Sequence, residues 1–489
     1  MSASAQQQPA TQPAPEGGVL ERILTEGRLA REEHQVAGAR TMLQGFVAEA
    51  LHDGVRVDAG AKRAIAERIA ALDRLIAEQV NEVLHHPRLQ KLEATWRSLD
   101  KLVAENDLSS SMRVRVLNCH RAEIERDLAR APAFDQSRLF KSVYESEYGT
   151  LGGTPYSFLV GDFEIGRSPK DIDFARQVAG VAAMAHAPLY ASASPDLLDL
   201  DGFGELDRPI DLAAIFDASE MAAWRSLRDH PDSRYLVLTA PRVLVRAPWG
   251  PDSVEEMHFV EEVEGPDASR YLWGSAAWRV ADVTMKSFGR YGWPCAIRGT
   301  EGGGRVENLP LHVFPSLSGA RITQCPTEIN ITDRREKELS DQGIIALCHA
   351  KHTDYAVFFS GSTVHRPKKY VEDDATANAR LSASLPYVLA CARFAHYLMA
   401  IKRDRIGAFS SRVEDEQMLN TWISQYVTAD DSASHGAKAR YPLREARVTV
   451  EDVAGKPGVR RAVAHLRPHY QLEGLSASLR LVAELPAQA

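Results

Sequence analysis

The sequence feature that most constrains the fold is an alternation of apolar and polar residues near the C-terminus. Between Gly474 and Pro486, apolar residues occupy every second position: Leu475, Ala477, Leu479, Leu481, Ala483 and Leu485. A period of two residues is typical of a β-strand with one buried face and one wet face. Residues 447–453 and 462–466 have a similar character, and a Gly-Lys-Pro-Gly turn at 455–458 separates them. We therefore expect the chain to end in a small antiparallel sheet.

The final strand of this sheet has no later strand in the sequence to cover it. An exposed strand edge can pair with another chain. It can equally be an ordinary edge strand that packs against its own domain. The alternation leaves both readings open, because it indicates only that one face is buried.

Length and composition restrict the class of protein. A chain of 489 residues is long enough for about three domains. The net charge of −8 and the pI near 6.1 argue against a nucleic-acid-binding protein with a basic surface. The five cysteines include no Cys-x-x-Cys pair, which is typical of reduced thiols in a cytosolic protein.

The sequence predicts neither a membrane span nor a signal peptide. The most apolar stretch, residues 385–401, contains Arg393 and His396 and falls short of the roughly eighteen uninterrupted apolar residues of a span. Residues 1–18 are rich in Gln, Pro and Ala and lack an apolar core, so we expect a disordered leader. The expected location is the cytoplasm.

Helical periodicity dominates the N-terminal quarter of the chain. Residues 19–33 can form a short helix whose apolar stripe includes Leu20, Ile23 and Leu24. Such a helix either packs on its own domain or serves as a helix-in-groove ligand for a partner. Residues 36–105 predict long amphipathic helices that break at His85-His86-Pro87, since proline suits the first turn of a new helix.

The middle of the chain alternates between short apolar runs and helical patterns, which predicts a mixed α/β fold with a sheet flanked by helices. Residues 112–117 are expected to form a short strand. One long apolar helix is expected over residues 374–407. Its end carries Lys402, Arg403 and Arg405, and cations at a helix C-terminus complement the helix dipole. A second, shorter helix over 409–427 includes Arg412.

No motif predicts chemistry. The glycine-rich loop at 299–305 lacks the Lys-Ser/Thr end of a phosphate-binding loop, so a tight turn is expected there. The Cys348, His349 and His352 cluster has no second half for a metal. Ser360 is not part of a nucleophile elbow. We expect no catalytic residue, no cofactor and no bound metal.

Four collinear stretches match a known family: residues 139–161, 232–250, 291–310 and 325–407. They contain Gly-Thr-Leu-Gly-Gly-Thr-Pro-Tyr at 149–156, Gly-Trp-Pro-Cys-Ala-Ile-Arg-Gly at 292–299 and Cys-Pro-Thr-Glu-Ile at 325–329. With these sequence motifs the chain resembles the large subunit of the type VI secretion contractile sheath, the TssC/VipB family. The likeness extends from about Val19 to the C-terminus.

This resemblance implies a structural protein with a contractile tail-sheath-like fold. It implies that the chain pairs with a small sheath subunit of the TssB/VipA type. Further copies would form a helical polymer around an Hcp-type tube, on a baseplate. A ClpV-type AAA+ ATPase would dismantle the contracted sheath. Nucleic acid and membrane insertion play no part in this picture.

The resemblance also assigns roles along the chain. It implies a leader at 1–18, an ATPase-recognition helix at 19–34 anchored by Leu20, Ile23 and Leu24, and a helical region at 35–134 that packs with the small subunit. A central α/β sheath domain follows at 135–375, and an inner domain at 376–489 carries the long helix and the C-terminal linker strands.

Two sets of contact residues follow from these roles. Leu475, Ala477, Leu479 and Leu481 are the expected inter-subunit strand. Lys402, Arg403, Arg405 and Arg412 are the expected tube-facing residues. The alternative expectation, from the residues alone, is a cytosolic α/β enzyme whose site the sequence does not reveal.

Overall fold

The computed structural model describes residues 35–52, 61–108, 111–251, 253, 259–263, 265, 267–315, 319–405, 411–430, 432–453, 460–469 and 479–484. The chain divides into two compact units. Residues 1–80 and 251–259 form the first unit, and residues 81–250 and 260–489 form the second.

The N-terminal region is helical, as the periodicity predicts. Helix α2 spans Val36–His52, α3 spans Ala61–Leu84 and α4 spans Pro87–Ala104. The predicted break at His85-His86-Pro87 is confirmed: Pro87 opens α4, and the ring of His86 accepts a hydrogen bond from the backbone N–H of Arg88. The predicted strand at 112–117 is wrong: this segment is an irregular stretch that forms no strand with any segment the structure describes.

A six-stranded sheet forms the centre of the second unit. Its order is β1 (Leu159–Ile165), β2 (Leu189–Ala193), β3 (Leu236–Ala240), β9 (Ile344–His349), β10 (Ala356–Phe358) and β6 (Arg305–Val306). The first four strands are parallel, with Leu189 paired to Leu236 and Leu238 to Ile344, and β10 and β6 are antiparallel. Parallel strands are covered on both faces, which explains why β2 and β3 are buried throughout.

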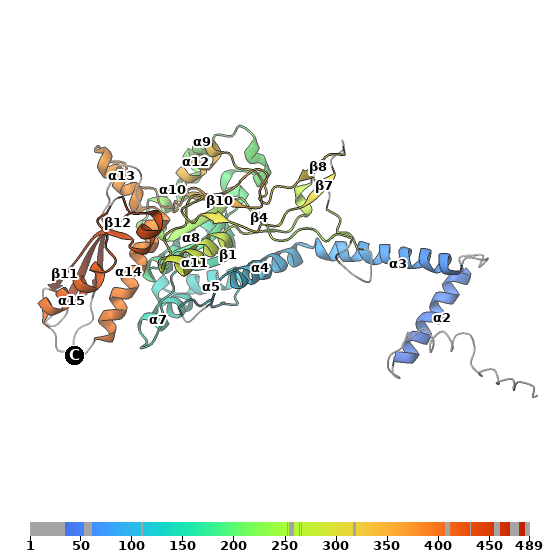
Figure 1. Cartoon of the computed structure of the whole chain (residues 1–489), viewed down its shortest axis with the longest axis horizontal. Coiled ribbons are helices and arrows are strands. Elements are labelled where there is room, and N and C mark those ends of the chain that lie inside the picture. The colour runs from blue at the N-terminus through green and yellow to red at the C-terminus, as the bar shows by residue number, and fades with distance from the viewer. Residues whose placement is uncertain are drawn as a thin grey trace, which may run out of the picture. The chain divides into compact units, whose positions relative to one another are not determined.

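Two hydrophobic cores lie on the two faces of this sheet. One face of β2, β3 and β9 supplies Leu189, Leu238 and Ala346 to a core shared with helices α8 (Pro169–Met184), α9 (Leu212–Asp217), α10 (Ala222–Asp229) and α12 (Asp333–Asp341). The other face supplies Tyr190 and Val237 to a core shared with α11 (Ala277–Tyr291) and α14 (Leu385–Asp404). The expected flanking of a sheet by helices is confirmed (Figure 1).

The single helix expected over 374–407 is wrong. The structure has α13 (Asp373–Ser382) and α14, separated at Ala383-Ser384. Thr363 captures the carbonyl of Ala383 through both its backbone N–H and its hydroxyl, and Leu385 N–H donates to the carbonyl of Gly361. Pro386 lies in the first turn of α14, where its missing N–H costs nothing.

The chain continues with α15 (Arg412–Ser424), α16 (His435–Arg440) and a three-stranded antiparallel sheet of β11 (Leu443–Asp452), β12 (Arg460–Pro468) and β13 (Leu479–Glu484). The predicted C-terminal antiparallel sheet is thereby confirmed. The remaining helices and strands are short: α5 (Arg121–Arg130), α6 (Arg138–Phe140), α7 (Ser146–Tyr148), β4 (Val243–Leu244), β5 (Trp273–Gly274), β7 (Val313–Pro315) and β8 (Arg321–Thr323). None of the helices in the described ranges is sufficiently long and apolar to span a bilayer.

Candidate functional site

The C-terminal sheet has one face in the protein core. Val448 and Val450 of β11, and Ala462, Ala464 and Leu466 of β12, are buried in the same core as α14 and α15. Val448 pairs with Ala464, and Val450 pairs with Ala462. The sheet is therefore fastened to the body of the second unit through its apolar face.

Helix α15 closes the outer edge of β11. The side-chain amide of Asn420 donates to the carbonyl of Val448 at 2.7 Å and accepts from its N–H at 2.9 Å. Glu416 accepts from Val450 N–H at 3.1 Å, and Arg412 donates to the Val450 carbonyl at 3.2 Å. These side chains occupy the backbone groups that a further strand would need.

The same edge is also closed at the start of β11. Leu443 N–H donates to the carbonyl of Tyr426, and Thr428 N–H donates to the carbonyl of Leu443. Strand β13 forms the opposite edge of the sheet and pairs only with β12 among the described strands. Another chain could therefore extend this sheet beside β13.

The predicted inter-subunit residues lie partly on this edge. Leu479 pairs with Leu466 and Leu481 pairs with Ala464 across β12 and β13. Leu475 and Ala477 lie outside the described residues, as do Leu20, Ile23 and Leu24 of the expected ATPase-recognition helix.

A buried carboxylate joins three elements beside the sheet. Asp415 of α15 is 1% exposed. It accepts from Nζ of Lys402 at the end of α14 at 2.7 Å, and from Nη1 of Arg460 at the start of β12 at 2.8 Å. Asp415 could not be recognised from the sequence, because nothing in the spacing of these three residues indicates that they meet.

The expected tube-facing residues have different surroundings. Lys402 donates a hydrogen bond to the carboxylate of Asp415. Arg403 donates hydrogen bonds to the backbone carbonyls of Glu147 and Thr150. Arg412 binds Val450 but keeps about half of its side chain exposed, and Arg405 is exposed at the end of α14. Among the four, Arg405 and Arg412 are thus the residues that retain a surface a partner could reach.

Helix α4 carries an exposed apolar stripe opposite its buried face. Its buried face presents Ala94, Ser98 and Leu102. On the other side Leu92 is 54% exposed and Trp96 is 59% exposed. These two side chains lie one turn apart and form the exposed apolar stripe of α4.

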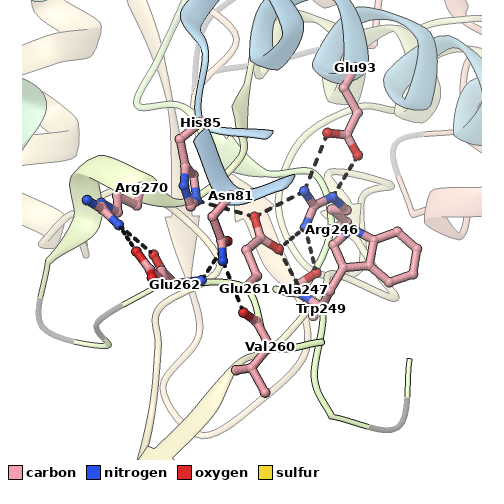
Figure 2. Close-up of polar contacts among 10 residues, drawn as sticks. All are labelled: Asn81, His85, Glu93, Arg246, Ala247, Trp249, Val260, Glu261, Glu262 and Arg270. Carbon is pink, nitrogen blue, oxygen red and sulfur yellow. Dashed lines mark hydrogen bonds and ion pairs between the residues drawn. The ribbon is translucent and has the colours of Figure 1, made fainter. Parts of the chain in front are cut away.

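A polar network attaches this helix to a neighbouring segment (Figure 2). Arg246 binds Glu93 of α4 through Nε at 2.7 Å and binds Glu261 through Nη1 at 2.6 Å. Glu261 also accepts from the backbone N–H of Trp249 at 2.9 Å. Asn81 lies in the last turn of α3. Its side-chain Oδ1 accepts a hydrogen bond from the backbone N–H of Glu262 at 2.9 Å, as a backbone carbonyl of a neighbouring strand would.

The network is electrostatically balanced. Burial opposes ionisation of Glu93, but the hydrogen bonds from Arg246 and Arg97 outweigh burial and keep the pKa of Glu93 below its usual value. Burial also opposes the charge of Arg246, yet its bonds to Glu261 and Glu93 raise the pKa of Arg246. Each buried charge therefore has a counter-ion, and α4 is held with its exposed stripe facing outward.

The motifs considered for chemistry have structural roles. Gly303 has φ +90, and a Cβ there would lie 2.1 Å from the carbonyl oxygen of Ala296, which confirms the expected tight turn. His349 Nε2 lies 2.9 Å from the carbonyl of Thr353, and burial raises the pKa of the Cys348 thiol to about 12. In the part of the chain that the structure describes, no group of three potential ligands could hold a metal ion.

Comparison with known proteins gives two family matches. The VipB family model, described as EvpB/VC_A0108, tail sheath N-terminal domain, matches residues 66–365. A second model, described as EvpB/VC_A0108, tail sheath gpW/gp25-like domain, matches residues 374–485.

The type VI secretion system sheath protein TssC1 of Pseudomonas aeruginosa is 43% identical over 462 residues, which cover 94% of this chain and 93% of that protein. Among solved structures, a chain of the anti-feeding prophage baseplate aligns over 65% of this chain and 64% of its own length, with 12% identity and a TM-score of 0.32. A TM-score this low does not establish a shared fold.

Proposed function

The chain belongs to the VipB tail sheath family of type VI secretion systems, and on that premise we propose that it pairs with a small sheath subunit and polymerises around an Hcp-type tube. It is a structural subunit of the contractile sheath, so the alternative of a cytosolic enzyme is set aside. A sheath does work because one set of subunits has two packings, and the extended packing is metastable.

The observation that supports pairing is the apolar stripe of α4. Leu92 and Trp96 lie one helical turn apart, and both are more than half exposed. The network around Arg246 fixes this helix, so little conformational entropy is lost when a partner helix binds it. We assign the stripe to the small sheath subunit, within the helical region proposed for residues 35–134.

Replacing both Leu92 and Trp96 with aspartate should abolish retention of the small subunit and leave the fold intact, because neither side chain is buried. The experiment is co-expression with a tagged small subunit, followed by affinity purification and negative-stain microscopy. Wild-type chains should form tubules. The double variant should be purified without its partner. Retention of the partner at the wild-type level would remove α4 from the interface.

The second element of the proposal is the β13 edge as the joint between neighbouring subunits. Side chains of α15 and the segment 426–428 occupy the other edge of the sheet, and this supports addition of a strand beside β13. The inner domain proposed for residues 376–489 carries this joint, and the central domain proposed for 135–375 carries the six-stranded sheet.

Replacing Leu479 and Leu481 with aspartate should leave the heterodimer intact and prevent polymerisation. The alternation in the sequence places both residues on the apolar side of the strand, and an unpaired buried charge costs several kcal/mol. Tubule length in electron micrographs is the measurement, and Ser478→Asp, on the polar side of the alternation, is the control. Tubules of normal length from the double variant would contradict the proposal.

The remaining partners are proposed from the family. Arg405 and Arg412 are the candidates for the tube contact, together with Lys402 and Arg403 if contraction releases them. The helix at 19–34 is the proposed ligand of a ClpV-type ATPase, and the sheath would assemble on a baseplate in the cytoplasm. ATP-dependent disassembly of tubules that lack residues 1–33 would rule out this helix as the sole ATPase ligand.

A further inference from the structure

Arg279, in the first turn of α11, is a buried cation without a partner. The residue is 2% exposed. Its guanidinium has no hydrogen bond and no ion pair with any residue that the structure describes. Arginine carries five N–H donors and stays protonated in proteins. A buried charge that is neither paired nor hydrated destabilises a fold, so an anion beside this guanidinium would remove a large energetic penalty.

The surroundings of Arg279 contain more positive than negative charge. Helices α4 and α11 lie side by side (Figure 1), and five charged side chains from α11 and the C-terminal end of α4 interact there. The cations are Lys101, Arg279 and Lys286, and the carboxylates are Glu105 and Asp282. Three cations against two carboxylates leave one positive charge without a counter-charge.

Both carboxylates are already occupied by other donors. Nζ of Lys286 lies 2.8 Å from Oε2 of Glu105 and 2.7 Å from Oδ2 of Asp282. The side-chain amide of Asn106 donates to Oδ1 of Asp282 at 2.8 Å. Lys101 lies 3.4 Å from Oε1 of Glu105. Neither carboxylate lies within ion-pair distance of the guanidinium, which therefore has no direct counter-ion among the described residues.

The pKa directions locate the missing negative charge within this cluster. Burial lowers the pKa of Arg279, and Asp282 and Glu105 offset only part of this effect. Burial, followed by repulsion from Arg279, also lowers the pKa of Lys101. Burial opposes the charge of Lys286 too, but there the two carboxylates outweigh burial and raise the pKa. The uncompensated charge thus lies on the side of Arg279 and Lys101.

A small group can reach this part of the cluster from solvent. Nε of Arg279 is sealed from solvent, whereas Nη1 and Nη2, which also lack a partner, keep a small contact with it. Lys101 donates to the carbonyl of Asn308 at 2.6 Å, and its side chain is 18% exposed. Because only 2% of Arg279 is exposed, the opening suits an ion and excludes a segment of another chain.

We propose that Arg279 binds a small oxyanion from solution, with Lys101 as the second cation of the site. A guanidinium group binds two oxygens of a phosphate or carboxylate through two parallel hydrogen bonds. The bound oxyanion would supply the missing negative charge and fasten α11 to α4. The site lies within one chain, so it does not depend on the proposed pairing with a small subunit.

The test measures thermal unfolding of the full chain in phosphate and in chloride at equal ionic strength. Phosphate stabilises folded proteins in general, so Arg279→Met supplies the background. We expect phosphate to raise the midpoint of the wild type by at least about 2 °C more than that of Arg279→Met, and the effect should saturate. Arg290→Met, at an exposed arginine of the same helix, is the matched control and should respond as the wild type does.

Calorimetric titration with phosphate gives a second measurement. The wild type should bind one phosphate per chain, and Lys101→Met should bind it about tenfold more weakly. This variant decides the outcome if Arg279→Met does not fold, because Lys101 lies at the rim of the cluster.

Two results would overturn the proposal. One is an equal effect of phosphate on the wild type and on both variants of the site. The other is a higher midpoint for Arg279→Met than for the wild type at saturating phosphate, because replacing a buried cation that has no ligand with an apolar side chain is stabilising.

Discussion

Replacing Asp415 with alanine should lower the free energy of unfolding by about 3–5 kcal/mol. The carboxylate is 1% exposed, and it neutralises Lys402 and Arg460 at 2.7 and 2.8 Å. Without it, the largely buried Lys402 loses its counter-charge, and Arg460 keeps a longer ion pair, at 3.7 Å, with the exposed Asp452. Guanidinium titration of the purified sheath complex, followed by circular dichroism, measures the change.

The matched control is Asp404→Ala in the neighbouring turn. Asp404 lies 3.4 Å from Arg403, but its side chain is 61% exposed, and exposed ion pairs contribute about 0–1 kcal/mol. A loss from Asp415→Ala no larger than that from Asp404→Ala would show that the buried ion cluster does not stabilise the junction of α14, α15 and β12. The C-terminal sheet should loosen in Asp415→Ala before the six-stranded sheet does, because Arg460 opens β12.

The second large effect is a loss of stability in mild acid that depends on His396. This residue of α14 is buried, its Nε2 lies 3.0 Å from the carbonyl of Ala185, and its ring lies 6.3 Å from that of His186. Burial, together with the nearby His186 and Arg393, lowers the pKa of His396 to about 3. Burial lowers the pKa of His186 to about 4. The ring of Tyr148 also faces His396, at 5.9 Å.

Both folded pKa values lie below the unfolded value of about 6.5. At a pH between the folded and the unfolded value, the unfolded chain therefore binds more protons than the folded chain. The stability due to the neutral rings is complete above about pH 6.5 and is lost as the pH falls towards 4 and then 3. His396 alone should account for about 2 kcal/mol of the loss between pH 7 and pH 5.

His396→Gln should reduce this pH dependence, since an amide can still donate to the carbonyl of Ala185 but does not titrate. The measurement is the denaturation midpoint at pH 7 and pH 5. The exposed His435, replaced with Gln, is the control and should leave the pH dependence unchanged. An identical loss of stability in wild type and His396→Gln would contradict the assignment.

Features with a local cause could be predicted from the sequence. The break before α4 follows from Pro87, and the C-terminal sheet follows from a period of two residues around a Gly-Lys-Pro-Gly turn. The buried parallel strands follow from short apolar runs. Each of these signals lies within a window of about ten residues, which is the range over which periodicity and turn chemistry act.

Features that depend on distant partners could not be predicted in this way. The break between α13 and α14 needs Thr363 and Gly361 to capture backbone groups from another part of the chain. Strands β7 and β8 are three residues long, which is too short for a period to be recognised.

By itself, then, the sequence determined the family, the mixed α/β class and the C-terminal strands, because these depend on residue order and local patterning. The tertiary structure alone decided that the β11 edge of that C-terminal sheet is occupied, since Asn420 reaches Val448 across 28 residues of chain. It also decided that Lys402 lies in a buried ion cluster. A polar side chain has many possible partners of matching charge, and only the folded packing selects which of them comes within hydrogen-bond distance.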